Sequence, residues 1–159
     1  MRVAWTGHRP DLFLDPDAAR AALEAVAHDL MGHGAEMFLV GGQRGVDTWA
    51  AQAALREEIP FQVVLPLGVP EFTRDWTQAD RRACEALIAR AASVEIAGGY
   101  TERNHVLGTA AQLLVVVWTG TGGGGTAETI AFARQAGTAI REILLPAATT
   151  AGSAVGRGI

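Results

Sequence analysis

The sequence predicts an α/β fold, a Rossmann-like three-layer sandwich in which helices cover both faces of a mostly parallel sheet. Two observations support this prediction. Short apolar segments alternate with longer segments of helical periodicity along almost the whole chain of 159 residues. Several apolar segments, above all residues 113–118 with the sequence LLVVVW, show no polar alternation, which indicates strands buried on both faces.

The predicted strands are short apolar segments, each followed within two residues by glycine or proline. Glycine and proline are typical of strand ends, because glycine favours turns and proline has no backbone N–H to donate a hydrogen bond to the sheet. The predicted strands comprise residues 2–6, 37–40, 61–65, 93–97, 113–118 and 138–145.

The first predicted helix begins near Pro16, a residue that suits the first helical turn, and ends at Gly32. Apolar residues recur at helical spacing between residues 18 and 30. Residues 68–75 are predicted to form a loop. Further helices are expected over residues 46–58, 76–92, 101–112 and 126–135.

Composition excludes several classes of protein. The hydrophobic share of 49% permits a sizeable core, while no apolar run reaches the 18 residues of a spanning helix. The start of the chain lacks the apolar core of a signal peptide, so a cytoplasmic protein without membrane association is expected. The single cysteine, Cys84, excludes an intramolecular disulfide, and the four histidines show no metal-ligand spacing, so no metal is expected.

Charge also limits the functions that the sequence supports. The net charge of −4 does not favour a generally basic nucleic-acid surface. All 13 basic residues are arginine, which excludes a Schiff-base lysine and the lysine of a P-loop. Phosphate binding remains compatible with this composition, because the guanidinium group can donate two parallel hydrogen bonds to phosphate.

Three strand-to-helix loops share glycine and either a hydroxyl or an arginine just before a predicted helix: residues 6–10, 41–47 and 119–126. Glycine lets the backbone approach a ligand closely, and a helix start offers free N–H groups to an anion. Because ligands of parallel sheets bind at the carboxyl ends of the strands, a phosphate-containing ligand is expected there. The predicted ligand-binding residues are Thr6, Gly7, Arg9, Gly41, Gly42, Arg44, Gly45, Asp47, Asn104, Gly122, Gly123, Gly124, Gly125 and Thr126.

Each of these features also has a structural alternative. A glycine loop can merely connect two elements, and Arg103 at a helix start can be a solvated surface residue. Asp47 and Glu128 can serve only the helix dipole, since both stand near predicted helix starts. No Ser-His-Asp or Cys-His arrangement is evident, so a covalent hydrolase is not predicted.

Taken together, TGHRP at residues 6–10, GGQRGVDTWAAQAAL at 41–55, Arg103-Asn104 and GGGGTAET at 122–129 resemble the SLOG superfamily of Rossmann-like proteins. The second motif is especially similar to the YpsA-like branch. The resemblance covers residues 2–145 and implies a single nucleotide-binding domain over residues 1–146, which usually forms a homodimer. Residues 147–159, which are small and polar, are predicted to be a disordered tail.

The superfamily includes the LOG phosphoribohydrolases, whose motif P-G-G-x-G-T-x-x-E ends in a catalytic glutamate. In the matching register of this chain, Thr129 occupies the glutamate position and Glu128 stands one residue earlier. One residue on a helix is a rotation of about 100°, so Glu128 is predicted to point elsewhere. Arg103 matches the catalytic arginine. The resemblance therefore gives Arg103 and Glu128 as the candidate catalytic residues, with the hydrolase reaction in doubt.

The favoured function is binding of a nucleotide or nucleotide-derived ligand, such as AMP or ADP-ribose, by a sensor or carrier that requires no other cofactor. The first alternative is a nucleoside 5'-monophosphate phosphoribohydrolase with Glu128 or Asp47 as its carboxylate. The second alternative is a molybdenum-cofactor carrier, because DprA-like and carrier-like proteins share the superfamily. A DNA-binding role ranks last because of the acidic balance. The helices at residues 46–58 and 101–112 are the candidates for a homodimer interface.

Overall fold

The computed structural model describes residues 1–149, in which six strands form one parallel sheet. Each pair of neighbouring strands in this sheet runs parallel. The predicted Rossmann-like α/β fold is therefore confirmed. The strands are β1 (Arg2–Gly7), β2 (Met37–Val40), β3 (Phe61–Leu65), β4 (Ser93–Ile96), β5 (Leu113–Trp118) and β6 (Ala139–Leu144).

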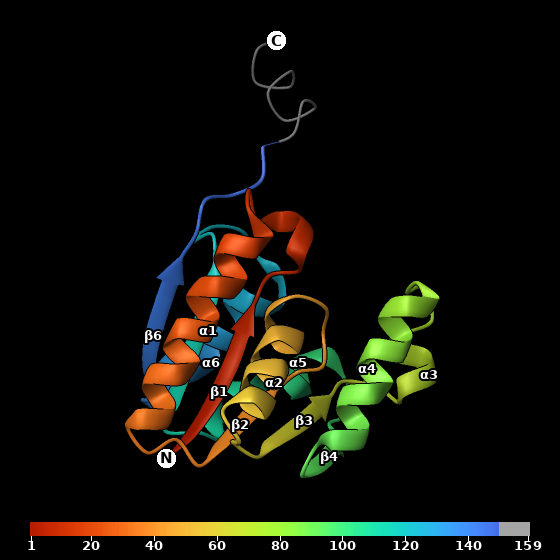
Figure 1. Ribbon diagram of the computed structural model, residues 1–159, viewed down its shortest axis with the longest axis horizontal. Helices are drawn as coiled ribbons and strands as arrows, with labels where there is room; N and C mark the ends of the chain where they lie inside the picture. Colours follow the sequence, from red (N-terminus) through yellow and green to blue (C-terminus); the bar gives the residue numbers. More distant parts are fainter. Residues whose placement is uncertain (150–159) are drawn as a thin grey trace.

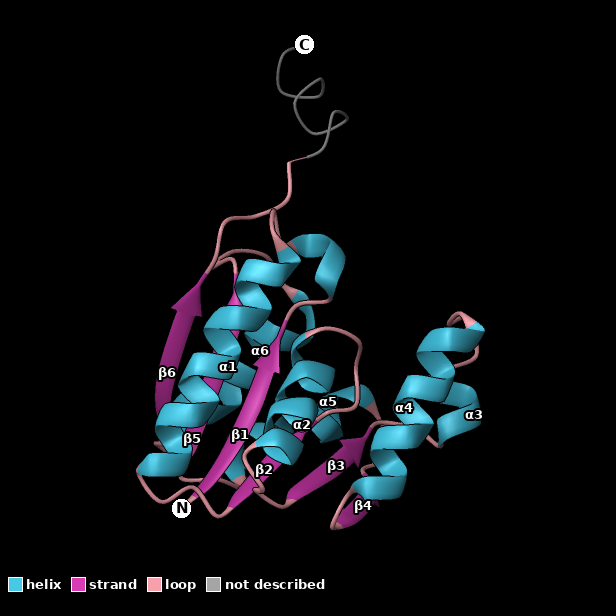
Figure 2. Ribbon diagram, in the orientation of Figure 1, coloured by secondary structure: helices cyan, strands magenta, loops and turns pink. Residues whose placement is uncertain are grey.

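Helices cover both faces of this sheet (Figures 1 and 2). On one face α1, α2 and α4 pack over the larger apolar cluster, and on the other α5 and α6 pack over the smaller one. The helices are η1 (Pro10–Leu12), α1 (Pro16–Gly32), α2 (Val46–Arg56), α3 (Val69–Phe72), α4 (Gln78–Arg90), α5 (Tyr100–Thr109) and α6 (Gly124–Ala136).

The short helix α3 lies in a segment that was predicted to be a loop. Pro70 suits its first turn, and the hydroxyl of Thr73 donates a hydrogen bond of 2.7 Å to the carbonyl of Val69. A single turn of four residues is too short to give a periodic apolar pattern, so the sequence does not indicate it.

The strand order is β4-β3-β2-β1-β5-β6. From β1 the chain builds outward to β4, and α5 then leads it back to β5 on the other side of β1. The order of the strands therefore reverses between β1 and β5, which is where ligands bind in open parallel sheets. The loops after β1, β2 and β5, three neighbouring strands, lie on the same edge, as the sequence predicts.

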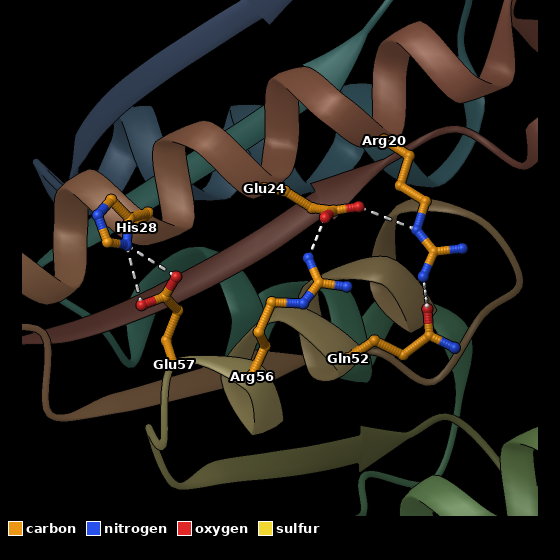
Figure 3. A network of polar contacts seen from close by, with 6 residues as sticks. All are labelled: Arg20, Glu24, His28, Gln52, Arg56 and Glu57. Carbon is orange, nitrogen blue, oxygen red and sulfur yellow. Dashed lines mark hydrogen bonds and ion pairs between the residues drawn. The ribbon is translucent and has the colours of Figure 1, made fainter.

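A surface network of ion pairs joins α1 to α2 (Figure 3). The carboxylate of Glu24 accepts a hydrogen bond of 3.1 Å from Arg20 and pairs with Arg56 of α2. One turn further along, His28 lies 2.9 Å from the carboxylate of Glu57. Because the cationic partners are exposed and the two carboxylates are only partly buried, the network contributes less to stability than the apolar contact beneath it.

The chain beyond β6 returns to the loop after β1. The backbone N–H of Ala148 donates a hydrogen bond to the carbonyl of Leu12, and that of Leu14 donates one to the carbonyl of Pro146. The donor–acceptor distance is 3.0 Å in both. The paired chain thus extends past the predicted domain boundary at residue 146. The rest of the predicted tail, residues 150–159, lies outside the described residues. Among residues 1–149, no helix is long and apolar enough to cross a membrane.

Gly7 marks a point where three backbone segments approach closely. A Cβ atom at this position would collide with the carbonyl oxygen of Val117 and would lie 2.6 Å from the Cγ2 atom of Val46. Because Val46 begins α2 and Val117 belongs to β5, a side chain at residue 7 would push α2 away from the sheet edge.

We therefore expect Gly7→Ala to lower the free energy of unfolding by about 1–3 kcal/mol, the usual cost of overpacking. Gly32→Ala is the matched control, because no atom lies within 4 Å of the added Cβ and alanine favours the helix. The control should be neutral or slightly stabilising. Urea unfolding of both variants measures the difference, and equal stabilities would contradict the close approach described above.

Candidate functional site

A cleft of about 960 Å³ lies at the carboxyl ends of the central strands. Its walls come from the loops after β1, β2 and β5 and from the first turns of α5 and α6. This position coincides with the reversal of strand order between β1 and β5. The predicted site residues that line it are Thr6, Gly7, Arg9, Asp47, Arg103, Asn104, Gly122, Gly123, Gly124, Gly125, Thr126 and Glu128.

The glycine run leads directly into the N-terminus of α6. The helix begins at Gly124, and Gly123 is its N-cap, with no side chain accepting from the free N–H groups. The φ angle of Gly124 is +79°, a value that residues with a Cβ rarely adopt. Since no acidic residue stands in the first turn, the partial positive charge of the helix start is open to the cleft.

Arg103 is almost buried in the wall of the cleft, with 6% of its surface exposed. Its Nη1 atom donates a hydrogen bond of 2.6 Å to the carbonyl of Gly41, and its Nε atom donates one of 2.8 Å to Oδ1 of Asn104. Burial lowers the pKa of this guanidinium, and the nearby Asp47 opposes that effect. Arg103 therefore ties α5 to the loop after β2.

Asp47 is buried beside Arg103 in the first turn of α2. Its Oδ2 atom accepts a hydrogen bond of 3.1 Å from the backbone N–H of Gln43. Burial raises the pKa of Asp47 to about 6, although the positive charge of Arg103 acts in the other direction. This carboxylate therefore changes charge closer to neutral pH than an exposed aspartate does.

Glu128 faces the cleft, so the prediction that it points elsewhere is wrong. Its Oε1 atom accepts a hydrogen bond of 3.0 Å from the amide of Asn104, and its Oε2 atom accepts one of 3.2 Å from the hydroxyl of Thr101. Thr129, by contrast, is 0% exposed, and its hydroxyl donates to the carbonyl of Gly125. The carboxylate that α6 contributes to this cleft thus comes from residue 128 rather than from residue 129.

Four predicted site residues, all in the loop after β2, do not line the cleft. Gly41 lies beneath Arg103, and Gly42 packs toward Leu65. Gly45 packs against the backbone of His8. The fourth is Arg44.

The guanidinium of Arg44 turns away from the cleft. Its central carbon lies 5.0 Å from the centre of the Trp76 ring, and its Nη1 atom lies 3.7 Å from a carboxylate oxygen of Asp80. Both partners follow in the sequence by more than 30 residues. Proximity to a glycine loop alone therefore could not predict where this side chain goes.

His8 and Tyr100 line the cleft but were not predicted as site residues. Nε2 of His8 lies 3.1 Å from the hydroxyl oxygen of Thr119, and burial lowers the pKa of the ring. His8 stands inside the TGHRP motif, and Tyr100 directly follows the Gly98-Gly99 pair after a strand. Both residues stand shortly after a predicted strand, and this position in the sequence could have marked them as site residues.

The fold and the cleft together define a Rossmann-like domain with a cleft at the reversal of its strand order. No family model matches the chain. Its sequence is 31% identical over 99 residues to the UPF0398 protein YpsA of Bacillus subtilis, a match over 56% of this chain and 55% of YpsA. A UPF0398 protein of Bacillus velezensis is 32% identical over 101 residues, or 54% of its length. The predicted resemblance to YpsA is confirmed, and the match spans about half the length of these relatives.

Solved structures show the same fold. DNA processing protein A (DprA) from Streptococcus pneumoniae matches with a TM-score of 0.67 and 19% identity, over 99% of this chain and 56% of that protein. The molybdenum cofactor carrier protein from Chlamydomonas reinhardtii matches with a TM-score of 0.61 and 20% identity, over 89% of this chain and 74% of that one. At these identities the likeness concerns the fold alone.

The buried carboxylate of Asp47 should make stability depend on pH. Its pKa of about 6 lies above the ordinary value of 3.8, so the folded state binds this proton more tightly than the unfolded state. The contribution to the free energy of unfolding is therefore largest at low pH and falls by about 2–3 kcal/mol as pH rises from about 4 to about 6.

Urea unfolding of the wild type and of Asp47→Asn at several pH values measures this effect. Relative to the variant, the wild type should lose stability as pH rises through that window. Asp17→Asn, at an exposed position in the first turn of α1, is the control for a surface carboxylate. Parallel curves for the wild type and Asp47→Asn would refute the expectation.

Proposed function

We propose that the chain binds a nucleotide or nucleotide-derived ligand in this cleft and acts as a sensor or carrier of it. The observation that carries the proposal is the uncapped N-terminus of α6, which opens onto the cleft through a run of glycines. Free N–H groups and the helix dipole favour an anion, and phosphate is the anion that nucleotides share. Arg9, half-exposed on the wall of the same cleft, adds a positive charge, and its Nε atom lies 4.0 Å from a carboxylate oxygen of Asp11.

A second feature supports a nucleotide rather than free phosphate. The carboxylate of Glu128 is held by Asn104 and Thr101, and it retains capacity to accept further hydrogen bonds. A carboxylate in such a position suits the hydroxyl groups of a ribose. The cleft volume of about 960 Å³ lies near the upper end of small-molecule sites, which fits AMP and also the longer ADP-ribose.

Hydrolysis of the N-glycosidic bond of a nucleoside monophosphate is the second candidate, and the orientation of Glu128 favours it. In this reaction Glu128 would take a proton from a water molecule that attacks the anomeric carbon. The bond from that carbon to the base would break, and the departing base would take up a proton. Arg103 is a positioning residue in this scheme, because its guanidinium binds Gly41 and Asn104.

Two further proposals rest on similarity. A carrier of the molybdenum cofactor needs an anion site without a catalytic base, and pterin fluorescence in the purified protein would identify it. A homodimer is implied by the SLOG resemblance. Of the two candidate helices, α2 buries seven of its eleven residues and α5 buries four of ten, so α5 is the candidate that we retain.

Arg9 and Arg44 give a matched test of the proposed binding. Arg9→Ala should weaken the binding of AMP and of ADP-ribose by about 3- to 10-fold, a modest loss because this arginine is half-exposed. Arg44→Ala should leave both affinities within about 2-fold, since Arg44 turns toward Trp76. Titration calorimetry measures both variants. The absence of binding by nucleoside monophosphates, diphosphates and ADP-ribose would refute the function proposed here.

Release of free base decides between binding and hydrolysis. If the chain only binds, incubation with AMP should leave the nucleotide intact, and chromatography should detect no adenine. If it hydrolyses AMP, Glu128→Gln should lower the rate by about 100-fold or more while AMP still binds, because it removes the base that activates water. Glu102→Gln, which changes an exposed carboxylate on α5, is the control.

A further inference from the structure

Tyr100 presents an exposed aromatic ring at one end of the cleft. It is the first residue of α5, it lines the cleft, and 49% of its surface is exposed. A large aromatic side chain left half-exposed in a cleft carries apolar surface that a ligand can cover.

The ring is held from behind by buried groups. Its centre lies 6.3 Å from that of Phe72, which is itself buried and packs against Trp76 at 5.0 Å. The central carbon of the Arg103 guanidinium lies 5.7 Å from the centre of the Tyr100 ring. These contacts limit the orientations of Tyr100 before any ligand arrives, so stacking on it costs little ordering entropy.

The helix α5 relates Tyr100 to the rest of the cleft. Residues three and four positions apart share one face of a helix, so Tyr100 lies above Arg103 and Asn104. Asn104 in turn donates to Glu128 on α6, whose own N-terminus opens onto the cleft. The cleft therefore offers three successive environments: helix N–H groups, a carboxylate with an amide, and an aromatic face.

We propose that Tyr100 is the stacking platform for a planar nitrogen heterocycle of the ligand, a purine or a pterin. This inference rests on the proposed function, because it assigns the ring of a ligand whose phosphate lies at α6 and whose sugar lies at Glu128. An aromatic face accepts any flat ring and reads no hydrogen-bond pattern, so Tyr100 supplies affinity for the heterocycle more than discrimination between bases.

The test compares ligands with and without the ring. Dissociation constants of AMP, a pterin monophosphate and ribose 5-phosphate are measured by calorimetry for the wild type, Tyr100→Phe and Tyr100→Ala. Tyr100→Ala should weaken binding of at least one ring-bearing ligand by about 5- to 150-fold, and ribose 5-phosphate by less than about 2-fold. Tyr100→Phe keeps the aromatic face and should bind like the wild type. The ring-bearing ligand with the larger loss is the one that stacks on Tyr100.

Two outcomes overturn the inference while the proposed function survives. Equal losses for ribose 5-phosphate and the ring-bearing ligands would mean that Tyr100 only supports Phe72 and Arg103. Unchanged binding of AMP and pterin monophosphate by Tyr100→Ala would place the heterocycle elsewhere. If the wild type binds none of the three ligands, the proposed function fails, and the inference with it. Thermal unfolding of each variant separates a loss of fold from a loss of stacking.

Discussion

The cleft depends on one buried interaction, the hydrogen bond from the guanidinium of Arg103 to the carbonyl of Gly41. A charged group with so little exposure needs partners: Gly41 and Asn104 accept two of its hydrogen bonds, and the charge of the nearby Asp47 offsets part of the cost of burial. Glycine at position 41 is part of the arrangement, because a Cβ there would lie 2.5 Å from Nη1 of Arg103. Through this contact, α5 is fixed against the loop after β2, and Tyr100 and Asn104 take their places beside the glycine run.

This use of Arg103 changes the electrostatic character of the cleft. Because two N–H groups of Arg103 already donate to Asn104 and Gly41, we expect an anion to depend mainly on the N–H groups at the start of α6 and on Arg9. Asp47 and Glu128 add negative charge along the same walls. A cleft of this kind suits a ligand with one compact anionic end and neutral hydroxyl groups. We expect such a cleft to accept a polyanion such as nucleic acid less well, as the net charge of −4 also predicts.

The fold was predictable from the sequence because the central strands are apolar segments and because every strand ends in, or is followed within two residues by, glycine or proline. Those signals are local. The edge at which the site lies followed from the parallel arrangement alone. What sequence reasoning could not supply is the direction of individual side chains in a loop. Arg44 is the clearest example: its partners Trp76 and Asp80 lie more than 30 residues further along the chain. Only the packing of α4 beside α2 brings them together.

The placement of Glu128 has a different physical origin, the close crossing of α5 and α6. A Cβ at Gly108 of α5 would lie 2.9 Å from the carbonyl oxygen of Thr129, so the two backbones are nearly in contact there. This crossing fixes the rotation of α6, and the buried residues Thr126, Thr129, Ile130 and Ala133 form its inner face. A glutamate at residue 129 would have to bury its carboxylate against α5, whereas residue 128 lies one step around the helix, toward Asn104. The motif alone therefore does not predict the direction of the Glu128 side chain, because packing decides which residues of a helix point inward.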